Sequence, residues 1–141
     1  MTTIGPYEFP DDLYYDSQHA WVRVEGNTAT IGLTQFGQDI AGDIVYVEAP
    51  RVGRSVVKDE PFMSMESGKW VGRLKAPVGG KIASANEEIE WESTLVNQEP
   101  YGKGWLAQIE MSDATELGAL MKAESPEFAA LIASERAKYN K

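Results

Sequence analysis

The sequence contains no cysteine and a single histidine, His19, among its 141 residues. The absence of thiols excludes disulfide frameworks, cysteine-ligated zinc, iron–sulfur clusters and cysteine nucleophiles. One imidazole cannot build a metal site of several histidines, and no G-x-S-x-G elbow presents a serine for a Ser-His-Asp triad. We therefore expect a protein that is not an enzyme.

Positive charge and long hydrophobic runs are also scarce. Lysine and arginine together number 13 against 22 acidic residues, which gives a formal net charge of −9. Such a chain lacks the basic footprint that binds nucleic acids, and anionic membrane surfaces repel it. Its longest apolar runs, such as 44–47 and 128–133, are too short to cross a bilayer, and its first residues do not resemble a signal peptide. We expect a cytoplasmic protein with neither nucleic-acid nor membrane partners.

Short stretches of alternating hydrophobicity fill the middle of the chain and predict a mainly β fold. Residues 21–25 and 29–33 flank Gly26-Asn27, a turn signal that predicts a β-hairpin. Several short strands separated by turns are typical of a compact sandwich or barrel. The other expected strands are residues 44–47, 55–57, 62–65, 70–74, 80–83 and 105–111.

The two ends of the chain differ from this middle part. Residues 1–12 contain Pro6, Pro10 and an acidic pair, which predict a loose N-terminal extension. We expect residues 13–111 to form the main domain and residues 112–141 to form a helical segment packed on it.

Capping signals predict where helices begin. Thr34 is expected to cap one short helix between the predicted strands 29–33 and 44–47. Near the C-terminus, Asp113 with Glu116 predicts one helix, and Ser125 followed by Pro126 predicts another, so we expect one or two C-terminal helices. Their apolar faces would be Leu117, Leu120 and Met121 in the first, and Phe128, Leu131 and Ile132 in the second.

Residues 63–74 contain the most informative pattern in the chain. Two β-patterned runs flank a tight turn, with Lys69 at or beside its tip. A turn presents its lysine away from the body of the protein, where another enzyme can modify it. A lysine in a surface turn is nevertheless more often only a solubilising charge, so the role of Lys69 depends on the rest of the chain.

An acidic cluster gives a different hypothesis. Glu87, Glu88, Glu90 and Glu92 lie close together but lack the Asp-x-Asp-x-Asp-Gly pattern of a calcium loop. They are expected to form a solvated face, which can also dock a partner. A cofactor-free acidic interaction module, in which Lys69 stays unmodified, is therefore one hypothesis for the function.

Six sequence blocks are distributed over most of the chain. They are HAWVRVEG from His19, GDIVYVEAP from Gly42, ESGK from Glu66, PVGG from Pro77, LVN from Leu95 and PYGKGWL from Pro100. In the same order, these blocks resemble motifs of the glycine cleavage system H protein family, and the family's E-S-V-K lipoyl-attachment motif is similar to the residues that end at Lys69.

The resemblance implies a lipoyl group in amide linkage on Lys69 and a lipoyl-domain barrel–sandwich hybrid fold with the lysine on a β-hairpin. The protein would be a non-catalytic shuttle, since tethering makes each visit of the arm to a docked partner effectively intramolecular. Its partners would include lipoylating enzymes and dihydrolipoamide dehydrogenase. Glu66, Ser67 and Gly68 would shape the turn and its recognition by the lipoylating enzyme. His19 would be either a packed, hydrogen-bonded residue or a wall of the lipoyl groove.

Four positions depart from the family pattern. Ala20 and Arg73 stand where the family has acids, while Gly68 replaces valine and Trp70 replaces alanine. A cationic aminomethyl cargo would lose two favourable charges, and Arg73 favours an anion. Our first hypothesis is therefore a carrier similar to the H-like lipoate-binding proteins that work with a heterodisulfide-reductase-like complex in bacterial sulfur oxidation. The alternative is a glycine cleavage system H protein, which carries an aminomethyl group between glycine decarboxylase and aminomethyltransferase.

Overall fold

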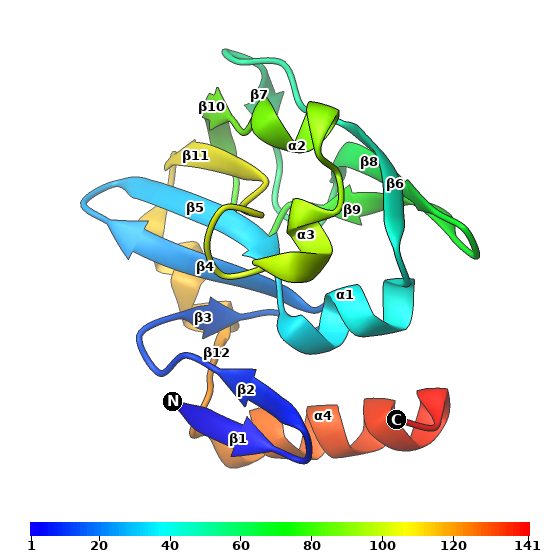
Figure 1. Cartoon of the computed structure of the whole chain (residues 1–141). Helices are drawn as coiled ribbons and strands as arrows, with labels where there is room; N and C mark the ends of the chain where they lie inside the picture. The colour runs from blue at the N-terminus through cyan, green and yellow to red at the C-terminus, as the bar shows by residue number, and fades with distance from the viewer.

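The computed structural model describes all 141 residues and is mainly β, as predicted (Figure 1). The strands are β1 (Thr2–Ile4), β2 (Tyr7–Phe9), β3 (Tyr14–Tyr15), β4 (Ala20–Glu25), β5 (Thr28–Leu33), β6 (Ile44–Glu48), β7 (Ser55–Val56), β8 (Pro61–Ser67), β9 (Val71–Lys75), β10 (Gly80–Ala85), β11 (Ala107–Met111) and β12 (Met121–Lys122). The helices are α1 (Gln35–Ala41), α2 (Glu88–Trp91), α3 (Leu95–Gln98) and α4 (Pro126–Tyr139), with a 3₁₀ helix, η1 (Ala114–Ala119).

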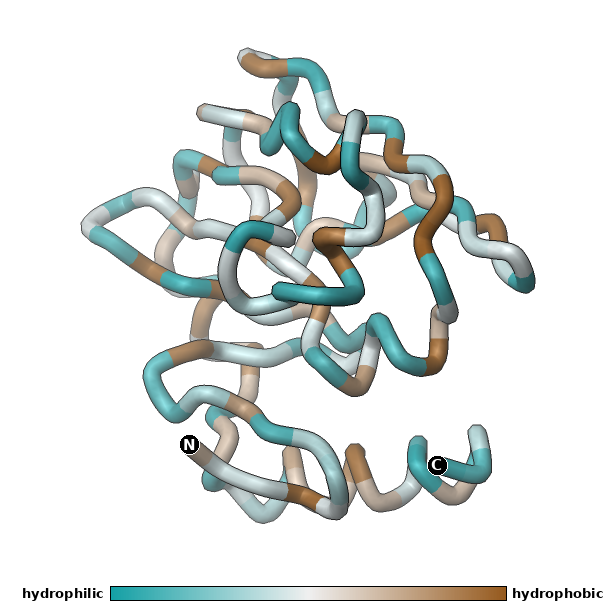
Figure 2. The backbone as a smooth tube through the Cα atoms, in the orientation of Figure 1, coloured by the Kyte–Doolittle hydropathy of each residue, from teal (hydrophilic) through white to brown (hydrophobic).

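Two antiparallel sheets pack around the main core. The larger sheet has the strand order β12-β3-β4-β5-β11-β10-β7, and the smaller one has the order β6-β8-β9. Alternate residues of β10 and β11 are buried, whereas β4 and β5 bury consecutive residues. Both sheets contribute to one hydrophobic cluster that includes Val22, Ile109 and Met65. Hydrophilic residues occupy the tips of the β4–β5 and β8–β9 hairpins (Figure 2). The predicted sandwich is confirmed.

Local turn and cap signals were reliable within this sandwich. Gly26 has a φ of 61°, and Glu25 pairs with Thr28 across the predicted turn. The Thr34 hydroxyl accepts a hydrogen bond from the Gly37 N–H at 3.0 Å, which caps α1 as expected. No helix in the structure combines the length and the apolar character that a membrane span requires.

The prediction of a loose N-terminal extension is wrong. Residues 1–12 contain the β1–β2 hairpin, and Tyr7 and Phe9 are buried in a second hydrophobic cluster with Phe128 and Ile132 of α4. Strands of three residues are too short to show a period, and their packing partner lies at the opposite end of the chain. The division into residues 1–12, 13–111 and 112–141 as separate units stays a prediction.

The C-terminal region departs from expectation in one further respect. The segment after Asp113 forms the 3₁₀ helix η1 rather than an α-helix, and Met121 lies in β12, where it pairs with Tyr15. The Glu116 carboxylate accepts a hydrogen bond from the Gly79 N–H instead of closing a capping box. The helix predicted after Ser125 is confirmed as α4, with the Ser125 hydroxyl accepting from the Phe128 N–H.

Candidate functional site: a lysine-bearing hairpin and the groove beside it

Lys69 lies at the tip of the β8–β9 hairpin, as predicted. The strands pair Glu66 with Val71, and the Ser67 N–H donates to the Trp70 carbonyl at 2.7 Å. This pairing leaves Gly68 and Lys69 as the two exposed residues of the turn. The hairpin extends from the body of the sandwich (Figure 1), so the Lys69 amine is accessible to another macromolecule.

Ser67 organises the turn. Its side chain is buried, and its hydroxyl accepts a hydrogen bond from the Lys69 N–H at 3.2 Å. Gly68 does not adopt a positive φ, and a β-carbon there would meet open space, so the turn does not require glycine at this position. Glu66 is half-buried on the strand face opposite to Ser67.

The stem of Lys69 rests on Gly42, the residue that ends α1. A β-carbon at Gly42 would stand 2.8 Å from the Lys69 Cε, and the φ of Gly42 is 87°. A larger residue would therefore be strained in its backbone and would also occupy the space of the lysine stem. Gly42, which begins one of the sequence motifs, thus leaves a cradle for the lysine stem.

Asn97 holds this cradle in place. Its Oδ1 accepts from the Ile44 N–H at 2.9 Å, and its Nδ2 donates to the Gly42 carbonyl and to Gln38 Oε1, each at 2.9 Å. The chain between α1 and β6 is thereby tied to α3 by one side chain. Asn97 belongs to the L-V-N motif, but the motif alone does not reveal that this side chain supports the site.

A mostly apolar groove of about 200 Å³ opens beside the hairpin. Trp70, the neighbour of Lys69, lines it, and Ala41, the neighbour of Gly42, lines it from α1. The Trp70 indole lies over Gly72, where a β-carbon would come within 2.4 Å of the ring. The other lining residues are Gln18, His19, Leu33, Gly37, Ile40, Leu74 and Tyr139.

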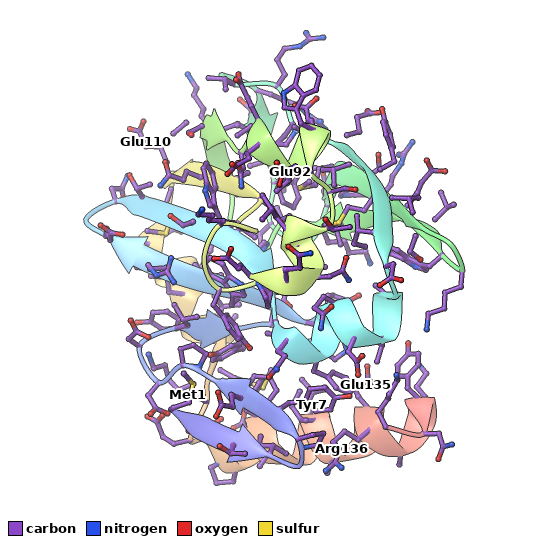
Figure 3. The ribbon with its side chains drawn as sticks, viewed as in Figure 1. Met1, Tyr7, Glu92, Glu110, Glu135 and Arg136 are labelled. Atoms are coloured by element: carbon purple, nitrogen blue, oxygen red, sulfur yellow. The ribbon has the colours of Figure 1, made fainter.

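His19 is packed and hydrogen-bonded, and it also lines this groove, while its role toward a lipoyl arm stays a prediction. It has a φ of 69°, next to a turn in which the Asp16 carboxylate accepts from the Gln18 and Ala20 N–H groups at 2.9 Å. Burial raises the pKa of Asp16 above its ordinary value. His19 Nε2 lies 2.8 Å from Glu135 Oε1, whereas its buried Nδ1 has no partner. Glu135 points from α4 toward α1 (Figure 3).

Arg73 does not join the groove. Residues alternate between the two faces of β9, so Trp70, Gly72 and Leu74 lie on the groove side while Arg73 is exposed on the other face. Arg73 lines a separate concavity of about 640 Å³ together with Arg51 and Arg54. Ala20, the other residue that stands where the family has an acid, is buried in the main core.

The acidic cluster lies away from the lysine, on and around α2. Its glutamates surround Trp91, whose side chain is 87% exposed. No group of three or more histidine, aspartate or glutamate side chains is placed to hold a metal ion. The cluster therefore forms a surface rather than a built site.

Comparisons with known proteins agree with this geometry. The sequence profile of the family described as glycine cleavage H-protein matches residues 13–131. A glycine cleavage system H protein from Brevibacillus brevis is 51% identical over 120 residues, which cover 85% of this chain and 95% of that protein. One from Bacillus cereus is 47% identical over 115 residues, which cover 82% of this chain and 91% of that protein. A crystal structure of a glycine cleavage system H protein from Mycobacterium marinum matches with a TM-score of 0.79 and 28% identity, covering 89% of this chain and 99% of that one. The predicted lipoyl-domain fold is confirmed.

Proposed function

Because the chain belongs to the glycine cleavage H-protein family, we propose that it is a non-catalytic carrier with a lipoyl group in amide linkage on Lys69. In this role it takes an aminomethyl group from glycine decarboxylase and delivers it to aminomethyltransferase. Lipoylating enzymes attach the group, and dihydrolipoamide dehydrogenase reoxidises it. The observation that carries the proposal is the exposed lysine at a hairpin tip, with its stem seated on Gly42 beside an apolar groove.

The residues around Lys69 fit a lipoyl group. When bound, the dithiolane supplies a disulfide that can accept and release a small group. The cradle at Gly42 directs the lysine stem, and the groove offers hydrocarbon from Trp70 and Leu74 to an apolar arm. The chain has no cysteine, so no internal thiol competes with the arm in thiol–disulfide exchange.

The position of Arg73 supports the glycine pathway over an anionic cargo. Its placement on the face opposite to Trp70 weakens the argument that it attracts an anion to the arm. The carboxylate of Glu135, bonded to His19 of the groove wall, contributes negative charge near the groove instead. The relatives reported above are named glycine cleavage system H proteins, so a role in sulfur oxidation has no support from them.

The experiment is loading from isotopically labelled glycine. The lipoylated chain is incubated with glycine decarboxylase and labelled glycine, with the Brevibacillus brevis relative as a positive control. We expect label on the lipoylated chain at a rate similar to the control, and no label on Lys69→Arg. Loading of the control but not of this chain would contradict the proposal.

A second candidate follows from Ala20 and Arg73, which remove both family acids. It is a lipoyl carrier for sulfur oxidation with a heterodisulfide-reductase-like complex. The variant Arg73→Asp restores the family residue at the exposed position, whereas Ala20 is buried in the main core and stays unchanged. If labelled glycine loads this variant many-fold faster than the wild-type chain, the wild-type cargo is not aminomethyl and the second candidate gains support. Equal loading of the two would remove it.

A further inference from the structure

The C-terminal end of α4 reaches the lysine groove. Residues 132–141 lie beyond the part of the chain that the family profile matches, which ends at residue 131. From this segment, Tyr139 lines the groove and Glu135 bonds to His19, another lining residue. Figure 1 places the end of α4 and the free end of the β8–β9 hairpin on the same side of the molecule.

We infer that residues 132–141 form a C-terminal wall of the groove, which retains the arm on Lys69 and limits its exposure to solvent. This inference rests on the proposed function, since it assigns the groove to the chain's own lipoyl arm. Within it, Tyr139 and Glu135 are positioning residues and take no part in chemistry.

The groove lies next to the seat of the lysine. Ala41 and Trp70 line it, and they adjoin Gly42 and Lys69 in the sequence. An arm that begins at Lys69 therefore has an apolar surface directly beside its point of attachment. Six of the nine lining residues are hydrophobic, which suits a hydrocarbon chain and a dithiolane better than water.

The C-terminal wall is anchored at both ends of its segment. Ile132 is buried in the second hydrophobic cluster, and Lys141 Nζ lies 3.5 Å from Asp39 Oδ2 of α1. The Tyr7 hydroxyl donates to the same Asp39 carboxylate, so the N-terminal hairpin and the C-terminus meet at one residue of α1. Burial and then this hydrogen bond raise the pKa of Tyr7 to about 12.

His19 connects the C-terminal wall to the groove. Because the buried Nδ1 lacks a partner, the ring's one hydrogen bond in the structure runs from Nε2 to Glu135. Phe36 of α1 packs edge-on against the ring at a centroid distance of 5.1 Å, and this contact restricts its rotation. Glu135 therefore fixes where the last turns of α4 lie relative to the groove.

The absence of cysteine allows a direct test. When the lipoylated chain is reduced, a thiol-reactive chromogenic disulfide reports only the two thiols of the arm. We expect Tyr139→Ala and a chain that ends at Ser134 to react several-fold faster than wild type. Glu135→Gln should react at a rate between that of wild type and those of these two variants. Ser134→Ala, an exposed change on the same helix, should react at the wild-type rate.

A second control distinguishes the loss of the C-terminal wall from a general loss of stability. Val56→Ala weakens the main core at the far edge strand β7 and should leave thiol reactivity unchanged. If Tyr139→Ala and the shortened chain both react at the wild-type rate while fully lipoylated, the inference is overturned and the proposed function stands. If no lipoyl mass is found on Lys69 of the wild-type chain, the proposed function itself fails.

Discussion

The aliphatic stem of Lys69 lies directly on the backbone of Gly42, with no room between them for a side chain. A β-carbon at position 42 would stand 2.8 Å from the lysine Cε and 3.5 Å from its Cγ and Cδ. The hairpin tip and the end of α1, which are distant in the sequence, therefore form one unit.

Gly42→Ala should disturb both the backbone and the lysine. Gly42 has a φ of 87° and a ψ of −172°, a backbone region that is almost restricted to glycine, so alanine there costs about 1–3 kcal/mol of unfolding free energy. Its methyl group also displaces the Lys69 stem. Gly53→Ala is the matched control, because Gly53 has a φ of 89° but nothing within 4 Å of a β-carbon. Urea unfolding should show a loss of stability for both variants, whereas only Gly42→Ala should slow lipoylation. If Gly42→Ala and Gly53→Ala are lipoylated at the same rate, Gly42 does not position the lysine for modification.

Gly72→Ala should move Trp70 out of the groove. Its methyl group would lie 2.4 Å from the indole, and the half-exposed ring can swing away from it. The chain has four tryptophans, so the Trp70 indole N–H gives one of four resonances in an NMR spectrum. That resonance should shift in Gly72→Ala and stay unchanged in Gly68→Ala, where the added carbon meets open space. An unshifted resonance in Gly72→Ala contradicts the packing described here.

Asn97→Ala should loosen the segment that supports the lysine. The change removes three hydrogen bonds and leaves the Ile44 N–H without its acceptor, which costs about 1–3 kcal/mol. Amide hydrogen exchange at residues 42–44 should accelerate with it. Asn27→Ala removes one hydrogen bond, to the Met111 carbonyl, and should leave that exchange unaffected. If amide exchange at residues 42–44 stays slow in both variants, Asn97 does not hold this segment in place.

Asp16 should give a distinctive pH dependence. Because burial raises its pKa, the folded chain retains this proton to higher pH than the unfolded chain does. The stability contributed by Asp16 is therefore greatest below the unfolded pKa and is lost as pH rises through the folded value. The unfolding free energy of wild type minus that of Asp16→Asn should fall from acid to neutral pH.

Asp113 provides the opposite control for this measurement. Hydrogen bonds from the Thr115 side chain and backbone lower the pKa of Asp113, so its contribution is present above the unfolded pKa and is lost as pH falls through the folded value. The difference between wild type and Asp113→Asn should therefore rise from acid to neutral pH. A difference of the same sign for both residues would contradict the assigned environments.

The features that could be predicted from the sequence are those set by near neighbours. The Gly26 turn, the Thr34 and Ser125 caps and the lysine at its hairpin tip depend on a few adjacent residues, and each lies where it was expected. The fold class followed from the alternation of short apolar runs and from the family motifs.

The features that could not be predicted depend on contacts between distant segments. Nothing near Pro6 reveals that the first strands pack on α4, and nothing near Lys69 reveals that Gly42 supports its stem. Sequence separation alone does not say which face of β9 carries Arg73, so the expected effect of Arg73 on the cargo could not take its side of the strand into account. The bond between His19 and Glu135 joins residues 116 positions apart.

The measurement that tests the central claim most directly is the intact mass of the chain after reaction with a lipoyl ligase, lipoate and ATP, and again after purification from its native host. Lys75→Arg, an exposed substitution on the same hairpin, serves as the control. The account predicts one lipoyl increment in wild type and in Lys75→Arg, and none in Lys69→Arg. An increment that survives in Lys69→Arg, or a native protein that works with a bare amine at Lys69, would contradict it and favour a cofactor-free interaction module.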